Sequence, residues 1–223
     1  AESEALKAEG FDHVVLATGI SPRKPAIPGI ESDKVATYLD IIEGRKQAGK
    51  AVAIIGAGGI GFDVGEFLTH SHDERSESER FNSEWGIDPT YASRGGLKPA
   101  VDEKSPRKVY LLQRKESKVG DGLAKTTGWI RRTLLKKRGV TMIPGVNYER
   151  IDEAGLHITV GGEAKTLPVD TIVVCAGQES RRELKAPLEA AGIPVTLIGG
   201  ADLAAELDAK RAIDQGTRVA AAL

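Results

Sequence analysis

The residues best suited to chemistry are glycines gathered in one short segment. The segment has the pattern G-x-G-x-x-G and reads Gly56, Ala57, Gly58, Gly59, Ile60, Gly61. Five apolar residues, 51–55, precede it and indicate a buried parallel strand, and a helix-like stretch, 60–69, follows. In this context Gly56 permits a tight turn, Gly58 lets the backbone approach a pyrophosphate, and Gly61 lets helix pack on strand. The segment therefore predicts a dinucleotide site, with the phosphates at the helix N-terminus.

Two basic residues indicate which dinucleotide is bound. An NAD-specific fold of this kind carries Asp or Glu at the end of its second strand. We expect that strand at 109–113, and Arg114 and Lys115 follow it in place of an acid. A guanidinium can hold a 2′-phosphate through paired N–H donors, and a lysine adds positive charge. The sequence favours NADP(H), and a solvated basic strand end is the plain alternative.

Two other expected strands end in small residues. The strand at 14–17 ends in Ala17, Thr18 and Gly19, and the strand at 171–175 is followed by Ala176 and Gly177. Small residues at the carboxyl end of a parallel strand leave room for a ligand. The likeness of the two ends suggests two similar nucleotide-binding halves.

The order of the expected elements predicts an α/β fold with a parallel sheet. Buried strands are expected at 14–17, 51–55, 109–113, 140–143, 171–175 and 194–198, and helices at 35–49, 60–69, 124–137 and 208–222. Residues 146–167 alternate between short polar and apolar runs, which predicts a small antiparallel meander. Residues 71–107 are polar and irregular, and we expect a partly ordered insertion anchored by Phe81, Trp85 and Tyr91.

Composition limits the class of protein. The chain has 223 residues, 40% of them apolar, and a net charge of −1, so nothing points to a nucleic acid or an anionic membrane as partner. Cys175 is the one cysteine, which leaves no intrachain disulfide and no cysteine metal cluster and suits a reducing, cytoplasmic setting. No apolar run reaches membrane-spanning length. Because the chain begins at Ala1 rather than Met, we expect a fragment of a longer polypeptide.

Several motifs, taken in order, resemble a known family. They are Ala17-Thr18-Gly19, Ile27-Pro28-Gly29, the glycine motif at 56–61, Cys175-Ala176-Gly177 and Ile198-Gly199-Gly200-Ala201-Asp202. This order resembles the carboxyl-terminal third of flavoproteins that bind two dinucleotides. The insertion and the stretch 206–216 resemble those of bacterial NADPH-dependent 2,4-dienoyl-CoA reductases, relatives of trimethylamine dehydrogenase. The resemblance covers essentially all 223 residues.

The resemblance implies domains and cofactors. Residues 31–180 would form a Rossmann-like NADP(H)-binding domain with the insertion 71–107, and residues 1–30 and 181–223 would be parts of an FAD-binding domain. Hydride would pass from NADPH to FAD, whose site is incomplete in this chain. FMN and a 4Fe-4S cluster would belong to upstream domains, which would be its partners.

The resemblance also assigns residues to the two nucleotides. The motif at 56–61 would face the NADPH pyrophosphate, with Ala176 and Gly177 beside the nicotinamide. Asp63 stands where relatives often carry a Glu that contacts the carboxamide. On the FAD side, Gly200 replaces an Asp that binds the ribityl chain. A cap at Asp208 would let the N–H groups around Leu207 and Ala209 meet FAD oxygens.

Two other functions stay open. One is a nucleotide-binding module without redox work, in which ADP serves structure. Arg114 and Lys115 argue against it, because a 2′-phosphate contact has little use there. The other is a general NAD(P)H:acceptor reductase with a different electron partner. No catalytic side chain and no metal ligand is expected in this chain.

Overall fold

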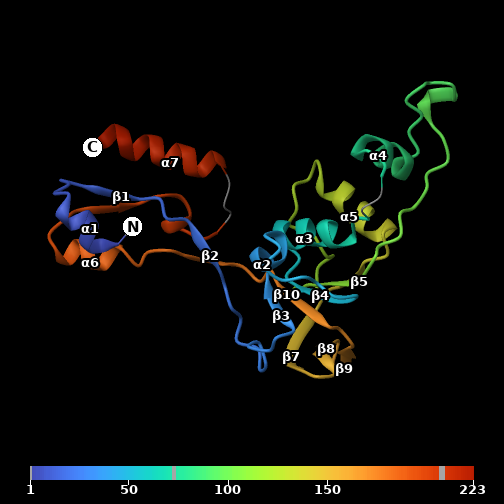
Figure 1. The fold of residues 1–223 in the computed structure, drawn as a ribbon, viewed down its shortest axis with the longest axis horizontal. Coiled ribbons are helices and arrows are strands. Elements are labelled where there is room, and N and C mark those ends of the chain that lie inside the picture. Colours follow the sequence, from blue (N-terminus) through green and yellow to red (C-terminus); the bar gives the residue numbers. More distant parts are fainter. Residues whose placement is uncertain (1, 72–73, 206–208) are drawn as a thin grey trace. The chain divides into compact units, whose positions relative to one another are not determined.

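The computed structural model describes residues 2–71, 74–205 and 209–223 (Figure 1). The chain divides into two compact units. The larger is Lys24–Ala176, and the smaller joins Ala1–Arg23 to Gly177–Leu223. The boundaries between the units therefore fall after Arg23 and Ala176. The expected boundaries, at residues 30 and 180, each lie several residues beyond them.

The larger unit is built on a five-stranded parallel sheet. Its strands are β3 (Val35–Thr37), β4 (Ala51–Ile55), β5 (Lys108–Leu112), β6 (Thr141–Ile143) and β10 (Thr171–Val174). Their order is β3-β10-β4-β5-β6, and each neighbouring pair is parallel. The strand after β4 in sequence lies on one side of it and β10 lies on the other. The strand order therefore reverses beside β4, where open α/β sheets bind their ligands.

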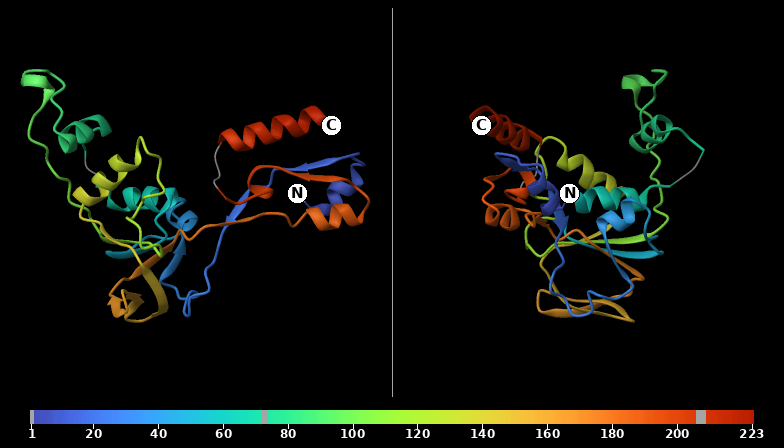
Figure 2. Two further views of the ribbon diagram at one scale, coloured as in Figure 1. Left: turned by 180° about the vertical axis from the view of Figure 1, so that it is seen from behind. Right: turned by 60° about the vertical axis from the view of Figure 1, so that its left-hand side comes forward.

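Alternate residues of each strand face opposite sides of this sheet. Val52 and Ile54 pack toward α2 (Tyr38–Ile42), α3 (Gly59–Thr69) and α5 (Gly128–Lys137). Ala53 and Ile55 pack toward the antiparallel meander of β7 (Val146–Asp152), β8 (Gly155–Val160) and β9 (Glu163–Leu167). Figure 2 shows the helices and the meander on opposite sides of the sheet. The α/β fold with a parallel sheet and a meander is thus confirmed.

The stretch 35–49 is not the helix that the sequence predicts. Its first residues form β3, and only Tyr38–Ile42 are helical. The Thr37 hydroxyl accepts from the Asp40 N–H, and the Asp40 carboxylate accepts from the Thr37 N–H. This capping box starts the helix after the strand. Hydrogen bonding to Thr37 lowers the pKa of Asp40, as expected for a carboxylate that must stay ionised to serve the cap.

In its described residues, the insertion contains one regular helix, α4 (Glu77–Trp85), and a short 3-10 turn, η1 (Arg94–Gly96). A second capping box, between Ser76 and Glu79, starts α4, and Gly86 in the left-handed region ends it. Of the expected anchors, Trp85 lies under the Lys137 ammonium of α5, 5.5 Å from ring centre to Nζ. Phe81 and Tyr91 are 53% and 81% exposed and do not anchor the segment.

A buried ion pair is the main anchor of α4. The Glu84 carboxylate accepts from Nε and Nη2 of Arg138, each at 3.0 Å. The two side chains are 3% and 7% exposed. A fork of this kind fixes both distance and angle, so it holds α4 against the end of α5.

The smaller unit contains two two-stranded sheets. β1 (Val14–Leu16) pairs in parallel with β12 (Val195–Leu197), and β2 (Ile20–Pro22) pairs antiparallel with β11 (Gln178–Ser180). The remaining elements are α1 (Ser3–Ala8), α6 (Lys185–Ala190), the 3-10 turn η2 (Gly199–Ala201) and α7 (Ala209–Ala222). Within the described ranges, no helix is long and apolar enough to cross a membrane.

The buried pair can be tested by removing one charge. Glu84→Ala leaves the Arg138 guanidinium buried without its counter-charge, so we expect the free energy of unfolding in urea to fall by about 3–5 kcal/mol. Replacing both residues, Glu84→Leu with Arg138→Met, should recover most of that loss. A loss below about 1 kcal/mol for Glu84→Ala, the size typical of a solvent-exposed pair, would show that the pair is not buried in solution.

Candidate functional site

The glycine motif forms the turn from β4 into α3. Gly56 has a φ of 108°, and a Cβ there would lie 2.3 Å from the carbonyl oxygen of Cys175, directly after β10. At Gly61 a Cβ would lie 1.9 Å from the carbonyl oxygen of Gly56. Both positions admit only glycine without movement of the backbone. Together they bring the first turn of α3 against β4 at the point where the strand order reverses.

The middle glycines border open space. Apart from atoms of the adjacent residues and of the helix's own backbone, no protein atom lies within 4 Å of the Cβ position of Gly58 or Gly59. Gly58 is the N-cap of α3, and no side chain caps its N–H groups. An uncapped helix start beside open space is suited to an anion, because unpaired N–H groups and the positive end of the helix dipole face it. Ile60 and Ala57 complete the turn and pack against the adjacent core.

The loop after β5 displays the two basic residues. Arg114 and Lys115 are both exposed. Gln113, which the sequence analysis did not single out, holds the loop: its Nε2 donates to the carbonyls of Lys115, at 3.0 Å, and Ser117, at 2.8 Å. The Lys115 carbonyl also accepts from the Gly145 N–H at 3.0 Å. Burial raises the pKa of Tyr148, and the nearby charge of Arg114 acts in the opposite direction. The backbone under the basic pair is therefore fixed while the side chains face solvent.

Asp63, on the first turns of α3, forms an exposed ion pair with Arg131 of α5. A contact with a carboxamide would have to share or replace that pair. Ala176 follows β10 beside Gly56, whose Cβ position lies 3.2 Å from the Ala176 amide nitrogen. Gly177 belongs to the smaller unit, where its carbonyl accepts from the Arg23 N–H at 3.0 Å.

In the smaller unit, two turns leave the same edge of a parallel strand pair. Leu16 of β1 is opposite Leu197 of β12, and its carbonyl accepts from the Ile198 N–H at 3.1 Å. The turn at Ala17, Thr18 and Gly19 and the turn at Gly199 and Gly200 therefore lie next to each other. The Thr18 hydroxyl donates to the Arg181 carbonyl at 2.5 Å.

Gln215 of α7 organises the second of these turns and was also missed from sequence. Its Oε1 accepts from the Gly199 N–H at 2.7 Å, and its Nε2 donates to the Asp202 carboxylate at 2.8 Å. A long amide side chain on the half-buried face of α7 is the signal that could have found it. Ala209 is the first residue of α7. The expected cap at Leu207 and Asp208 lies outside the described residues.

Cys175 is the one cysteine, and its side chain is buried behind the turn. Burial raises the pKa of the Cys175 thiol to about 12. The thiolate is the reactive form of cysteine, so we expect this residue to pack in the core and not to act as a nucleophile or a redox thiol.

Comparison with known proteins identifies the family. Residues 2–210 match the family described as pyridine nucleotide-disulphide oxidoreductase, and the chain belongs to that family. It is 27% identical over 205 residues to a metal reductase of Desulforamulus reducens, and the match covers 88% of this chain and 29% of the relative. It is 23% identical over 192 residues to a mercuric reductase of Lysinibacillus sphaericus, covering 84% of this chain and 28% of the relative. The chain thus spans less than a third of these curated relatives.

Solved structures of similar fold agree with this placement. A 2-naphthoyl-CoA reductase, in complex with 2-naphthoyl-CoA, has a TM-score of 0.71 at 24% identity over 97% of this chain and 27% of its own. Histamine dehydrogenase from Rhizobium sp. 4-9 has a TM-score of 0.66 at 21% identity over 100% of this chain and 32% of its own. At these identities the likeness shows the fold.

The comparisons correct one expectation. The resemblance to 2,4-dienoyl-CoA reductase is wrong, because the matches lead to the broader oxidoreductase family and to metal and mercuric reductases. Its basis was the glycine-rich strand ends, narrowed by the insertion and the stretch 206–216. Glycine-rich strand ends are needed by any protein that binds two dinucleotides, so they mark the fold and not a substrate, and the likeness of the insertion and of 206–216 did not fix a substrate either.

The glycine turn makes a paired prediction. Gly58→Ala should keep the fold, at a cost below about 1 kcal/mol, because the new methyl meets no protein atom. It should abolish dinucleotide binding, because that methyl occupies the space of the pyrophosphate. Gly61→Ala should instead lower the melting temperature of the ligand-free chain, because its methyl collides with the Gly56 carbonyl. Thermal unfolding and calorimetric titration of both variants check this, and normal binding by Gly58→Ala would contradict it.

The Cys175 thiol should be inert in the folded chain. With a pKa of about 12, only about one thiol in ten thousand is ionised at pH 8. Ellman's reagent should therefore label it only after unfolding in urea, which serves as the positive control. Rapid, complete labelling of the folded chain would show that the thiol is reactive.

Proposed function

We propose that the larger unit binds NADPH across the β4–α3 turn and that the chain serves hydride transfer from NADPH to FAD. One observation carries the proposal: Gly56 and Gly61 close the turn against protein atoms, while Gly58 and Gly59 leave its outer side open at an uncapped helix start. A structural role for the glycines would not require the open side. Family membership supports redox use of the site.

Each group at the site has a distinct task. The N–H groups at the start of α3 donate to the pyrophosphate, and the helix dipole favours its charge. Arg114 and Lys115 bind the 2′-phosphate, which an acid at that place would repel. Asp63, released from or shared with Arg131, binds the carboxamide, and Ala176 gives the nicotinamide room after β10. When bound, the dinucleotide supplies a hydride.

The smaller unit fits a partial FAD site. Its two turns, at 17–19 and 199–201, emerge side by side from parallel strands, and Gln215 fixes the backbone of the second. Gly200 offers backbone groups in place of a side chain. The rest of the FAD site, the electron acceptor and the partner domains lie outside the 223 residues in this proposal. We also propose a cytoplasmic location, which the single cysteine favours. The proposal does not depend on FMN or a 4Fe-4S cluster.

A general NAD(P)H:acceptor reductase is the second candidate. The similarity to metal and mercuric reductases favours it, since those relatives are named for inorganic acceptors. This chain itself contributes one buried thiol, so a dithiol acceptor site would have to come from elsewhere. Both candidates share the nucleotide site. A module that holds ADP only for structure is less favoured, because Arg114 and Lys115 would have no phosphate to bind.

Cofactor choice tests the assignment. Arg114→Ala removes a charge-assisted contact with the 2′-phosphate, so NADPH binding should weaken by roughly tenfold to a hundredfold. NADH has a hydroxyl at that position and should lose far less. Calorimetry at fixed ionic strength measures both. The exposed Arg94, on η1, provides a matched control: Arg94→Ala should leave both affinities unchanged. Equal losses for NADPH and NADH with Arg114→Ala would overturn the 2′-phosphate assignment.

A further inference from the structure

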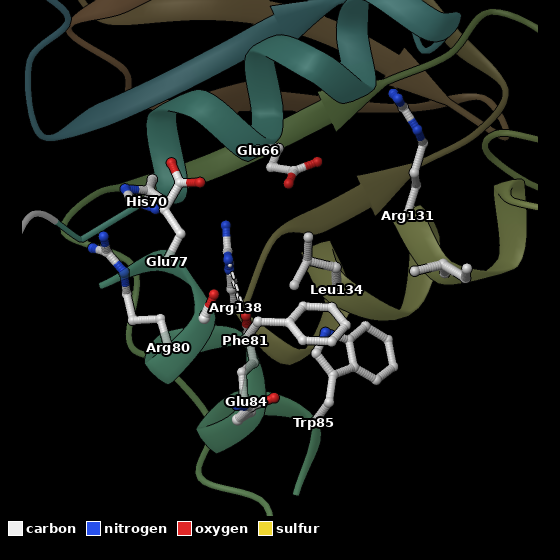
Figure 3. A pocket seen from close by; sticks show the side chains of 13 residues that line it. Glu66, His70, Glu77, Arg80, Phe81, Glu84, Trp85, Arg131, Leu134 and Arg138 are labelled. Carbon is white, nitrogen blue, oxygen red and sulfur yellow. Dashed lines mark hydrogen bonds and ion pairs between the residues drawn. The ribbon is translucent and has the colours of Figure 1, made fainter. Parts of the chain in front are cut away.

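A second cavity lies at the far end of α3 from the nucleotide site. It has a volume of about 700 Å³ and is bounded by α3, α4 and α5 (Figure 3). Ligand sites commonly have this size. Glu66 lines it and stands seven residues beyond Gly59, or about 10 Å along the helix. The cavity is therefore separate from the glycine turn. Its outer wall is α4, which belongs to the insertion and not to the sheet-and-helix frame.

One side of the cavity is apolar. Phe81 and Trp85 of α4 lie with ring centres 6.1 Å apart, and Ile130 and Leu134 of α5 complete this side. Figure 3 shows the two rings and Leu134 grouped together. Phe81 is 53% exposed although it stands in an ordered helix. This side can therefore bury an added apolar group.

The opposite side has an unmet hydrogen-bond donor. The Glu84 carboxylate accepts hydrogen bonds from Nε and Nη2 of Arg138. The third nitrogen, Nη1, is buried and, among the described residues, has no hydrogen-bond partner. In Figure 3 the guanidinium lies among the lining side chains, between the apolar group and the carboxyl groups of Glu66 and Glu77. A buried N–H without an acceptor is costly, so this edge of the guanidinium calls for a carboxylate or carbonyl oxygen.

Two solvent-accessible carboxylates line the same cavity. Glu66 of α3 and Glu77 of α4 both line the cavity, and in the described part of the chain neither carboxylate has an ion pair or a side-chain hydrogen bond. The lining as a whole balances three glutamates against three arginines, Arg80, Arg131 and Arg138. A ligand with a large net charge of either sign gains little there. A ligand that carries both charges can meet the donor and the acceptors together.

We propose that this cavity binds a zwitterion with an apolar side chain, namely a free amino acid. Its ammonium group donates to Glu66 and Glu77, its carboxylate accepts from Arg138 Nη1, and its side chain packs on Phe81 and Trp85. The site is additional to the nucleotide function and does not require it.

Three probes test the recognition on the 223-residue chain by calorimetry. L-Phenylalanine carries both charges, phenethylamine only the ammonium and 3-phenylpropanoate only the carboxylate. Phenylalanine should bind about tenfold or more tightly than either of the others. Equal binding of phenylalanine and phenethylamine would overturn the carboxylate contact. No binding of phenylalanine up to about 10 mM would overturn the site.

Variants locate the binding. Glu66→Gln and Phe81→Ala change surface-accessible positions and should each weaken phenylalanine by about tenfold. Glu149→Gln, an exposed glutamate of β7 outside the cavity, is the matched control and should not change it. Saturating NADPH should leave phenylalanine binding intact, which separates this site from the nucleotide site. Competition between the two, or full binding by both cavity variants, would overturn the proposal.

Discussion

The close approach of α3 to the turn after β4 is the constraint on which the candidate site depends. A side chain at position 61 would collide with the Gly56 carbonyl, and one at position 56 would collide with the Cys175 carbonyl. Glycine at both places lets one helix start meet the carboxyl ends of two neighbouring parallel strands. The open space beside Gly58 and Gly59 follows from that geometry. The core on both faces of the sheet, from Val52 to Ile55, keeps the strands in position beneath it.

The insertion adds structure at the other end of the same helix. Its helix α4 is held by a desolvated fork between Glu84 and Arg138 rather than by apolar contacts, since Phe81 stays half exposed. Burying two charges is costly, and replacing such pairs with apolar residues often stabilises a protein. In our proposal, the ligand supplies the acceptor that this fork leaves missing at the buried Arg138 Nη1. The larger unit then has two distinct surfaces, one at each end of α3.

Much of the fold and of the nucleotide site could be predicted from the sequence, and each wrong prediction has a physical cause. Residues 51–61 carry strand, turn and helix signals in direct succession. The local sequence pattern was therefore enough to predict the glycine turn between β4 and α3. Val35 looked helical because apolar spacing cannot separate a three-residue edge strand from a helix start. Helix α4 had a readable signal in the capping box at Ser76 and Glu79, but the polar composition hid it. The Glu84–Arg138 pair spans 54 positions, and no local pattern could reveal it. The predicted substrate class was wrong because glycine-rich strand ends report the fold alone, and the likeness of the insertion and of residues 206–216 did not fix a substrate.

The most direct test of the central claim is a crystal structure of the 223-residue chain with NADP⁺. The account predicts the pyrophosphate within hydrogen-bond distance of the N–H groups at Gly58 to Ile60, and the 2′-phosphate beside Arg114. Clear density for the nucleotide at any other place, with the space beside Gly58 filled by solvent, would contradict it.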